Sequence, residues 1–326
     1  MNHYIERTRI ALQARLADAP AGDVLREYFE RGKMLRASLV FASAASVGGD
    51  PDEVVIAAEA IELLHGASLF HDDIIDRATE RRGLASLHLR LGVGPALVLA
   101  DDLLLRAFAV LAEARASHPA AGVLEATDVL NELARQCCRG QFEELCSSRW
   151  ISEEQYFDIV RGKTAAPFIA SGVLGAIFGG GTSAQVARIR AYAGMLGVAF
   201  QIADDLLDLT SEARLIGKPA GNSLAQGRPL LPLIYLRRDG SDAALEELAR
   251  LSEVEWPRRE LAALLEREGV LDRVRQVQQE HVDAALAALA DLPNAHGVAA
   301  LRALAGRATA PFVSDPTVHV HTPASA

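Results

Sequence analysis

Helical patterning extends along almost the entire chain, and it constrains the fold more than any other feature of the sequence. Apolar residues recur at spacings of three and four, whereas no sustained alternation occurs and no Asn-Gly or Asp-Gly pair joins two β-branched runs. Segments rich in glycine and proline separate the helical stretches and indicate loops. The predicted helices span residues 3–18, 23–29, 33–47, 51–76, 93–115, 122–146, 152–160, 163–178, 183–209, 228–238, 242–251, 256–267, 269–290 and 296–311.

Composition supports the same fold class. Half of the 326 residues are hydrophobic and only 5% are aromatic, so Ala, Leu, Val and Ile must build most of the core. Ala and Leu are strong helix formers, and small residues allow helices to pack closely. We therefore predict an all-α fold in which residues 1–313 form a single helical domain. Residues 314–326 are rich in Pro, Thr, Ser and His, and we expect them to form a flexible C-terminal tail.

The acidic charge balance excludes one class of partner. The chain has 33 basic and 43 acidic residues, which give a formal net charge of −10. Proteins that bind nucleic acid need a surplus of Lys and Arg, so we expect no nucleic-acid partner. An anionic small ligand remains compatible with this balance, because a few local cations or bound metal ions can reverse the charge inside one cleft.

Cysteine use and the apolar runs indicate the compartment. Cys137, Cys138 and Cys146 form no zinc-binding pattern, and we expect them to be buried and reduced. The first seven residues lack the apolar stretch of a signal peptide. The apolar run 164–181 contains Pro167 and ends in glycines, which is typical of a buried helix rather than of a membrane span. We therefore expect a cytoplasmic protein without stable membrane insertion.

Two apolar helices end in the same acidic pattern. Residues 72–76 and residues 204–208 both read Asp-Asp-x-x-Asp. In a helix the first and last aspartates of each pattern share one face, whereas the middle ones, Asp73 and Asp205, lie about 100° around the axis. Like charges at this spacing repel each other, and the helix dipole disfavours anions at a C-terminal end. Folding alone therefore does not account for the repeated pattern, although a solvated acidic helix end is the simplest alternative for either copy.

A hard divalent cation does account for both acidic patterns. Mg²⁺ prefers oxygen ligands and typically takes one or two carboxylates together with phosphate oxygens. Two such clusters that face each other would hold several Mg²⁺ ions around a diphosphate. The repeated pattern therefore predicts a shared site for metal ions and a diphosphate.

Basic residues near both clusters suit the same anion. Lys33 and Arg36 share a face of the predicted helix 33–47, and Lys163 opens the predicted helix 163–178. A helix start with a nearby Lys favours phosphate, because free backbone N–H groups add to the charge. Any one such cation alone is better explained as a surface residue, so only the combination points to a site. The full set is Lys33, Arg36, Arg81, Arg82, Lys163 and Lys218.

Two further polar residues lie on the same faces as the aspartates. His65 precedes Asp72 by seven residues, and Gln201 precedes Asp204 by three. A lone helical His is usually structural, but here His65 is placed to donate to a second phosphate group.

The order and spacing of these residues resemble those of the trans-isoprenyl diphosphate synthases, also called polyprenyl synthetases. The similarity extends from about Gly32 to Leu236. The segments that carry it are Gly32–Arg36, Glu62–Asp76, Arg81–Gly83, Gly162–Thr164, Phe200–Asp208 and Gly217–Gly221. The resemblance implies an isoprenoid-synthase-type helical bundle around a deep central cavity, usually as a homodimer. It also implies condensation of isopentenyl diphosphate with an allylic diphosphate.

The resemblance further implies roles for individual residues. The implied cofactor is three Mg²⁺ ions bound together with the substrate diphosphate. Their ligands would be Asp72, Asp76, Asp204 and Asp208, with Asp73 and Asp205 in support. The allylic substrate would be held by Arg81, Lys163, Thr164, Gln201 and Lys218. The isopentenyl diphosphate would be held by Lys33, Arg36, His65 and Arg82. The expected catalytic set comprises the six aspartates with Lys163, Thr164 and Gln201.

Several positions depart from the family's usual pattern. Met34 and Ala37 stand where many members carry Arg and Pro, and Arg228 replaces a common Lys. Asn222 and Ser223 occupy a stretch that usually contains an Asp. We expect these changes to weaken the loop after the second cluster, whereas the metal-binding aspartates are intact.

Product length is expected to depend on side chains below the first cluster on its helix. Counting back from Asp72 along one face gives Ser68, Leu64 and Ile61, and Ile61 lies about 16 Å beneath Asp72. Ala67 and Ser68 are small where short-chain family members tend to carry an aromatic floor. We therefore predict a linear trans product of at least twenty carbons.

Two other functions fit parts of the same pattern. A class I terpene cyclase shares the ionisation of an allylic diphosphate but needs no second diphosphate site, and Asp208 with Glu212 only partly imitates its second metal motif. A non-catalytic subunit of a heteromeric prenyl synthase would tolerate the changes at Met34 and Asn222, but it would have no need of intact aspartates. Chain elongation uses the largest number of the residues identified above.

Overall fold

The computed structural model describes residues 1–210, 222–254 and 256–309, and within these ranges the chain is almost entirely helical. The predicted all-α fold is confirmed. The predicted tail at 314–326 and the predicted substrate ligand Lys218 lie outside the described residues.

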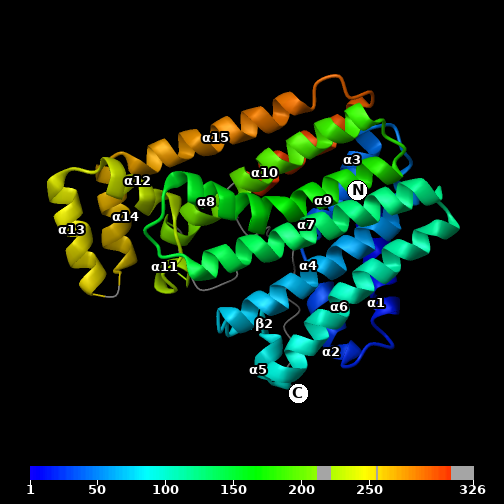
Figure 1. Ribbon diagram of the computed structural model, residues 1–326, viewed down its shortest axis with the longest axis horizontal. Helices are drawn as coiled ribbons and strands as arrows, with labels where there is room; N and C mark the ends of the chain where they lie inside the picture. Colours follow the sequence, from blue (N-terminus) through cyan, green and yellow to red (C-terminus); the bar gives the residue numbers. More distant parts are fainter. Residues whose placement is uncertain (211–221, 255, 310–326) are drawn as a thin grey trace, which may run out of the picture.

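The N-terminal half consists of helices and one short hairpin (Figure 1). Its elements are α1 (Asn2–Arg15), α2 (Gly22–Glu30), α3 (Leu35–Ser46), the 3₁₀ turn η1 (Pro51–Val54), α4 (Val55–Ile75), β1 (Glu80–Arg81), β2 (Leu84–Ala85), α5 (Leu87–Leu91), α6 (Val93–Glu113), the 3₁₀ turn η2 (Ala114–Ala116) and α7 (Ala120–Cys146).

The C-terminal half contains the second aspartate cluster at the end of its longest helix. Its elements are α8 (Glu153–Val160), the π-helical segment η3 (Arg161–Ala165), α9 (Ala166–Phe178), α10 (Ser183–Thr210), α11 (Asn222–Ala225), α12 (Leu231–Asp239), α13 (Asp242–Glu253), α14 (Arg258–Arg267), α15 (Val270–Ala288) and α16 (Ala295–Thr309).

The long helices lie side by side, with α9 among them. Figure 1 shows α4, α6, α7, α9, α10 and α15 running in similar directions, with α13 and α14 at one end of the molecule. Contacts join α4 to α6, α7 to α9, α9 to α10, and α10 to α15. Every residue of α9 except Ile169 and Ile177 is buried, as expected for a helix without a polar face. The helix ends just before Gly179, in agreement with the predicted glycine stop.

One helix is long and apolar enough to cross a membrane, but its position explains its composition. Residues Pro51–Ile75 meet the length and hydropathy requirement, and 67% of the relevant window is buried inside the protein. The helix carries core residues such as Leu63, which has no exposed surface. Burial against neighbouring helices therefore accounts for the apolar character of α4.

The structure differs from the prediction in three local features: the start of one helix, two short helices and a hairpin. Helix α3 begins at Leu35 rather than at residue 33, because Met34 adopts a left-handed backbone conformation with φ of 51°. Lys33 therefore lies before the helix and does not share a helical face with Arg36. The short helices α5 and α11 were also absent from the sequence-based prediction.

The third difference is a small hairpin between the first cluster and α5. Strands β1 and β2 pair Glu80 with Ala85 and Arg81 with Leu84. The two residues between them, Arg82 and Gly83, both have positive φ, at 57° and 74°. Positive φ at both central residues defines the type I′ turn that suits two-residue hairpins, although the first position here lacks the usual Asn or Asp. The hairpin places Arg81 and Arg82 beside the end of α4.

Candidate active site

The first aspartate cluster lies at the C-terminal end of α4, as predicted, and its three carboxylates have different environments. Asp73 has no exposed surface, and Arg81 Nε donates to its Oδ1 and Oδ2 at 2.9 and 3.2 Å. Burial raises the pKa of Asp73, and the Arg81 guanidinium opposes this shift. Asp76 forms an ion pair with Arg228. Asp72 is partly buried, and burial raises its pKa against the attraction of Lys163.

The second cluster lies near the C-terminal end of α10, and its middle aspartate is enclosed by neutral donors. Asp205 is 3% exposed. Its Oδ1 accepts from Gln201 Nε2 at 2.9 Å, and its Oδ2 accepts from the Tyr156 hydroxyl at 2.7 Å and the Leu231 N–H at 3.1 Å. Burial raises the pKa of Asp205 to about 7, against these three hydrogen bonds. Asp208 is also buried and accepts from the Leu224 N–H at 3.3 Å.

A π-helical segment places Lys163 and Thr164 between the two clusters. Helix α8 continues through η3 into α9, so Lys163 does not occupy a helix start, and the expected contribution of free helix N-terminal N–H groups is wrong. A Cβ added at Gly140 would lie 2.4 Å from the Lys163 backbone nitrogen. The glycine therefore allows α7 to approach η3 closely. Glu144 lies one turn further along α7, on the same face as Gly140.

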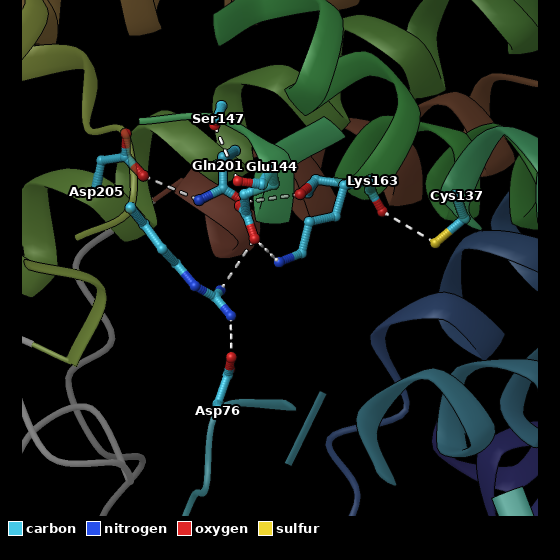
Figure 2. Close-up of polar contacts among 9 residues, drawn as sticks. Asp76, Cys137, Glu144, Ser147, Lys163, Gln201 and Asp205 are labelled. Atoms are coloured by element: carbon cyan, nitrogen blue, oxygen red, sulfur yellow. Dashed lines mark hydrogen bonds and ion pairs between the residues drawn. The ribbon is translucent and has the colours of Figure 1, made fainter. Parts of the chain in front are cut away.

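Glu144 contacts two cations, Lys163 and Arg228, which come from opposite sides of the site. Lys163 Nζ lies 2.5 Å from Glu144 Oε2, and Arg228 Nη1 lies 3.5 Å from the same oxygen. Because Arg228 also pairs with Asp76, a continuous series of contacts runs from the first cluster to Lys163. Figure 2 shows Asp76 on one side of this arrangement and Glu144, Lys163, Gln201 and Asp205 on the other. Thr164, next to Lys163, continues the series through Gln201 to Asp205 of the second cluster.

A small pocket lies against the second cluster. It is lined by Glu144, Tyr156, Ile159, Val160, Lys163, Thr164, Gln201, Asp205 and Pro229. The Thr164 hydroxyl donates to Gln201 Oε1 at 2.7 Å at the wall of this pocket. The pocket thus combines one cation, two carboxylates and three neutral polar side chains.

A second group of cations lies where α3, α4 and the hairpin meet. Arg36 Nη1 donates to His65 Nε2 at 2.9 Å, and Arg82 Nη1 donates to the Tyr28 carbonyl oxygen at 2.7 Å. Burial lowers the pKa of Arg36 to about 10, and burial together with Arg36 holds the pKa of His65 well below its usual range. His65 is therefore neutral, and its proton lies on Nδ1 because Nε2 accepts from Arg36. Arg36 Nε is buried and has no hydrogen-bond partner among the residues that the structure describes, which suits an anion at this position.

The comparisons with known proteins agree with this arrangement. A polyprenyl synthetase family model matches residues 20–262, a range that contains both clusters and both groups of cations. The chain belongs to the polyprenyl synthetase family. It is therefore an enzyme, a prenyltransferase.

Individual relatives cover most of the chain. A short chain isoprenyl diphosphate synthase from Methanothermobacter thermautotrophicus is 35% identical over 77% of this chain and 78% of its own length. A nonaprenyl diphosphate synthase from Mycobacterium tuberculosis is 33% identical over 90% of this chain and 87% of its own. The crystal structure of a polyprenyl synthase from Caulobacter crescentus, complexed with calcium and isoprenyl diphosphate, superposes with a TM-score of 0.86 at 28% identity and covers 95% of each chain.

Four residues of this polyprenyl synthetase's site were missed as functional candidates. Glu144, Tyr156 and Glu62 were not selected, and Arg228 was noted only as a departure from the family pattern. Glu62 is 3% exposed and accepts from the Ala37 N–H at 3.0 Å, at the start of α3. A carboxylate at 62 in an otherwise apolar helix, and one at 144 a turn beyond Gly140, were signals of buried polar function in the sequence.

The remaining predictions concern cysteines and the residues below the first cluster. Cys138 and Cys146 are exposed, so the expectation of three buried thiols is wrong for these two. Cys137 Sγ lies 3.4 Å from the Lys163 carbonyl oxygen, and burial raises the pKa of this thiol to about 12. The predicted chain-length residues all lie on α4: Ile61, Leu64 and Ala67 are buried, and Ser68 is partly exposed.

Proposed function

We propose that this polyprenyl synthetase condenses isopentenyl diphosphate with an allylic diphosphate and releases a linear trans-polyprenyl diphosphate and diphosphate. One observation carries the proposal most directly. Contacts through Arg228, Glu144 and Lys163 lead from Asp76 of the first aspartate cluster to a pocket that Asp205 of the second cluster lines. Acidic and basic side chains brought together in this way suit a metal-bound diphosphate better than they suit a purely structural role.

We propose that Asp72 and Asp76 from α4, with Asp204 and Asp208 from α10, hold three Mg²⁺ ions. The donor chemistry fits, because carboxylate oxygens are the ligands that Mg²⁺ prefers. Among the described residues, no three Asp, Glu, His or Cys side chains converge on one point. Diphosphate oxygens and water would therefore have to complete each coordination shell. When bound, Mg²⁺ neutralises the charge that develops on the leaving diphosphate.

The protein's own residues support ionisation of the allylic C–O bond. Lys163 and Arg228 are placed to hold the diphosphate oxygens as their negative charge increases, with Arg81 nearby on the hairpin. The oxygen atoms of Thr164 and Gln201 line the pocket in which the allylic carbocation would form. The apolar helices around the site keep water away, because water would convert the cation into an alcohol.

The second substrate would bind at the group formed by Arg36, His65 and Arg82, with Lys33 contributing from just before α3. The unpaired Nε of Arg36 is a donor for a diphosphate oxygen, and neutral His65 can offer its Nδ1 proton. The alkene of isopentenyl diphosphate then attacks the allylic carbon, and a carbon–carbon bond replaces the broken C–O bond. The resulting tertiary cation loses a proton to the departing diphosphate, which restores a double bond.

Product length is proposed to be twenty carbons or more. The reason is the small size of Ala67 and Ser68 on α4, one turn before the first cluster. The relatives leave the length open, since proteins named for short-chain and for nonaprenyl products are 35% and 33% identical to this chain.

We further propose that the protein is a cytoplasmic homodimer, with one helical domain over residues 1–313 and no stable membrane insertion. Large apolar side chains are exposed along the neighbouring helices α6 and α7, and a second copy of the chain would bury them. These side chains are Val93, Leu97, Val98, Leu105, Leu124, Phe142 and Leu145.

One assay separates the proposed function from its two alternatives. The purified protein is incubated with Mg²⁺, isopentenyl diphosphate and each allylic starter, and the products are identified by mass spectrometry. Elongated diphosphates support the proposal, and their masses give the product length. Cyclic hydrocarbons formed without isopentenyl diphosphate would indicate a terpene cyclase instead. Absence of turnover with every starter would indicate a non-catalytic subunit.

A further inference from the structure

A series of hydrogen bonds connects a buried tyrosine to the wall of the pocket. The Tyr156 hydroxyl donates to Asp205, Asp205 accepts from Gln201, and Gln201 accepts from Thr164, at 2.7, 2.9 and 2.7 Å. The four residues come from α8, α10 and η3, and all four line the same pocket. Tyr156 is 2% exposed, and its single hydroxyl proton is used in the contact with Asp205.

When Asp205 is ionised, the donors and acceptors in this series have one consistent direction. An ionised carboxylate can only accept hydrogen bonds, so Gln201 must present its NH₂ group to Asp205. The amide oxygen of Gln201 then faces Thr164, and the Thr164 hydroxyl must donate to it. The lone pairs of the Thr164 oxygen remain available at the pocket wall, where they can stabilise positive charge.

Asp205 is held in this acceptor role by donors on both of its oxygens. The Tyr156 hydroxyl and the Leu231 N–H bind Oδ2, which leaves Oδ1 for Gln201. Without the Tyr156 hydroxyl, Oδ2 would keep only the Leu231 N–H at 3.1 Å. The carboxylate would then be free to rotate, and the orientation of the Gln201 amide would no longer be determined by a single partner.

We propose that Tyr156 is a positioning residue that acts through Asp205 and Gln201 to orient the Thr164 hydroxyl. The inference rests on the proposed function, in which the Thr164 oxygen faces the allylic cation. Tyr156 touches neither substrate nor metal in this scheme. Its ring packs edge-to-face with Phe157, and a Phe at position 156 would keep the ring while removing only the hydroxyl.

The first test compares two Tyr→Phe variants in the full-length enzyme. Tyr156→Phe is expected to lower kcat for elongation about tenfold, since one preorganising contact is lost, with little change in the KM for isopentenyl diphosphate. The matched control is Tyr192→Phe. Like Tyr156, Tyr192 is buried, but it lies on α10. Its hydroxyl donates to the Leu301 carbonyl oxygen at 2.6 Å, away from the pocket. Both variants are expected to lose similar thermal stability, so only an effect on kcat distinguishes Tyr156.

The second test asks whether Tyr156 acts through Thr164. In a Thr164→Val background, Tyr156→Phe is expected to change kcat less than about twofold, because its target is gone. A further tenfold loss in that background would show that Tyr156 acts by another route and would overturn the inference. An unchanged kcat in the single variant would overturn it as well. A wild-type protein without elongation activity would instead overturn the proposed function, and this inference with it.

Discussion

The two aspartate clusters have the same sequence pattern, yet their middle carboxylates are held by opposite means. Asp73 on α4 is paired with the guanidinium of Arg81 from the adjacent hairpin. Among the residues that the structure describes, Asp205 on α10 accepts from a hydroxyl, an amide and a backbone N–H rather than from a cation. Both carboxylates are almost fully buried, at 0% and 3% exposure.

The difference shows what each middle aspartate does. Asp73 fixes the hairpin that carries Arg81 and Arg82 beside the first cluster. Asp205 fixes Tyr156, Gln201 and the start of α12 around the second. In both clusters the oxygens of the middle residue are engaged by protein donors, which supports the proposal that the outer aspartates hold the metal.

The largest effect is expected from the outer aspartates. Asp72→Asn and Asp204→Asn should each lower kcat/KM for elongation about a thousandfold, because each removes an anionic ligand from the proposed Mg²⁺ site. Steady-state assays over a range of Mg²⁺ concentrations measure the loss. Asp158→Asn on the surface of α8 is a suitable control. Near-normal activity in either variant would mean that the cluster concerned is not needed for the proposed Mg²⁺ site.

The middle aspartates should differ in their effect on stability. Asp73→Asn leaves the partly buried Arg81 without a counter-charge and is expected to reduce the free energy of unfolding by about 3 kcal/mol. Asp205→Asn keeps an acceptor for the neutral donors around it, strands no buried cation and is expected to cost about 1 kcal/mol. Urea denaturation in the presence of EDTA measures both values. Equal losses would mean that the two environments are energetically equivalent.

The pH dependence of stability should sharpen the same contrast. The pKa of Asp205 is about 7 in the folded protein, above its ordinary value of 3.8, so the folded state binds a proton more tightly than the unfolded chain. The contribution of Asp205 to the free energy of unfolding must therefore fall as pH rises from about 4 to about 7, and then level off. Melting curves in EDTA should show that the advantage of wild type over Asp205→Asn shrinks across this range. A difference independent of pH would contradict this expectation.

The smallest effect on rate is expected from a substitution of Ser68, which lies one turn before the first cluster. Ser68 precedes Asp72 by four residues, and Phe200 precedes Asp204 by four. Ser68→Phe would make α4 resemble α10 and should shorten the main product while the first condensation continues. Product analysis by mass spectrometry tests this, with Ser68→Ala as the control that removes the hydroxyl contact to the His65 carbonyl oxygen without adding bulk. An unchanged product distribution for Ser68→Phe would rule out this side chain as a determinant of length.

Helices and aspartate spacing could be predicted from sequence because both depend on neighbours within a few residues. The periodicity of α4 and the glycine stop after α9 are local signals of this kind. The turn at Arg82 was missed because positive φ at a residue other than Asn, Asp or Gly carries no strong sequence signal. The π-helical segment at Lys163 was missed because it follows from the close approach of α7 at Gly140, a contact between distant segments.

The sequence by itself determined that the chain is helical, that two helices end in paired acidic patterns, and that cations accompany them. Only the tertiary structure decided which partner each aspartate receives. Arg228 reaches Asp76 across 152 residues of chain, and Tyr156 reaches Asp205 across 49. A carboxylate's hydrogen bonds and burial depend on which helices pack beside it, and no repeat within its own helix encodes that choice.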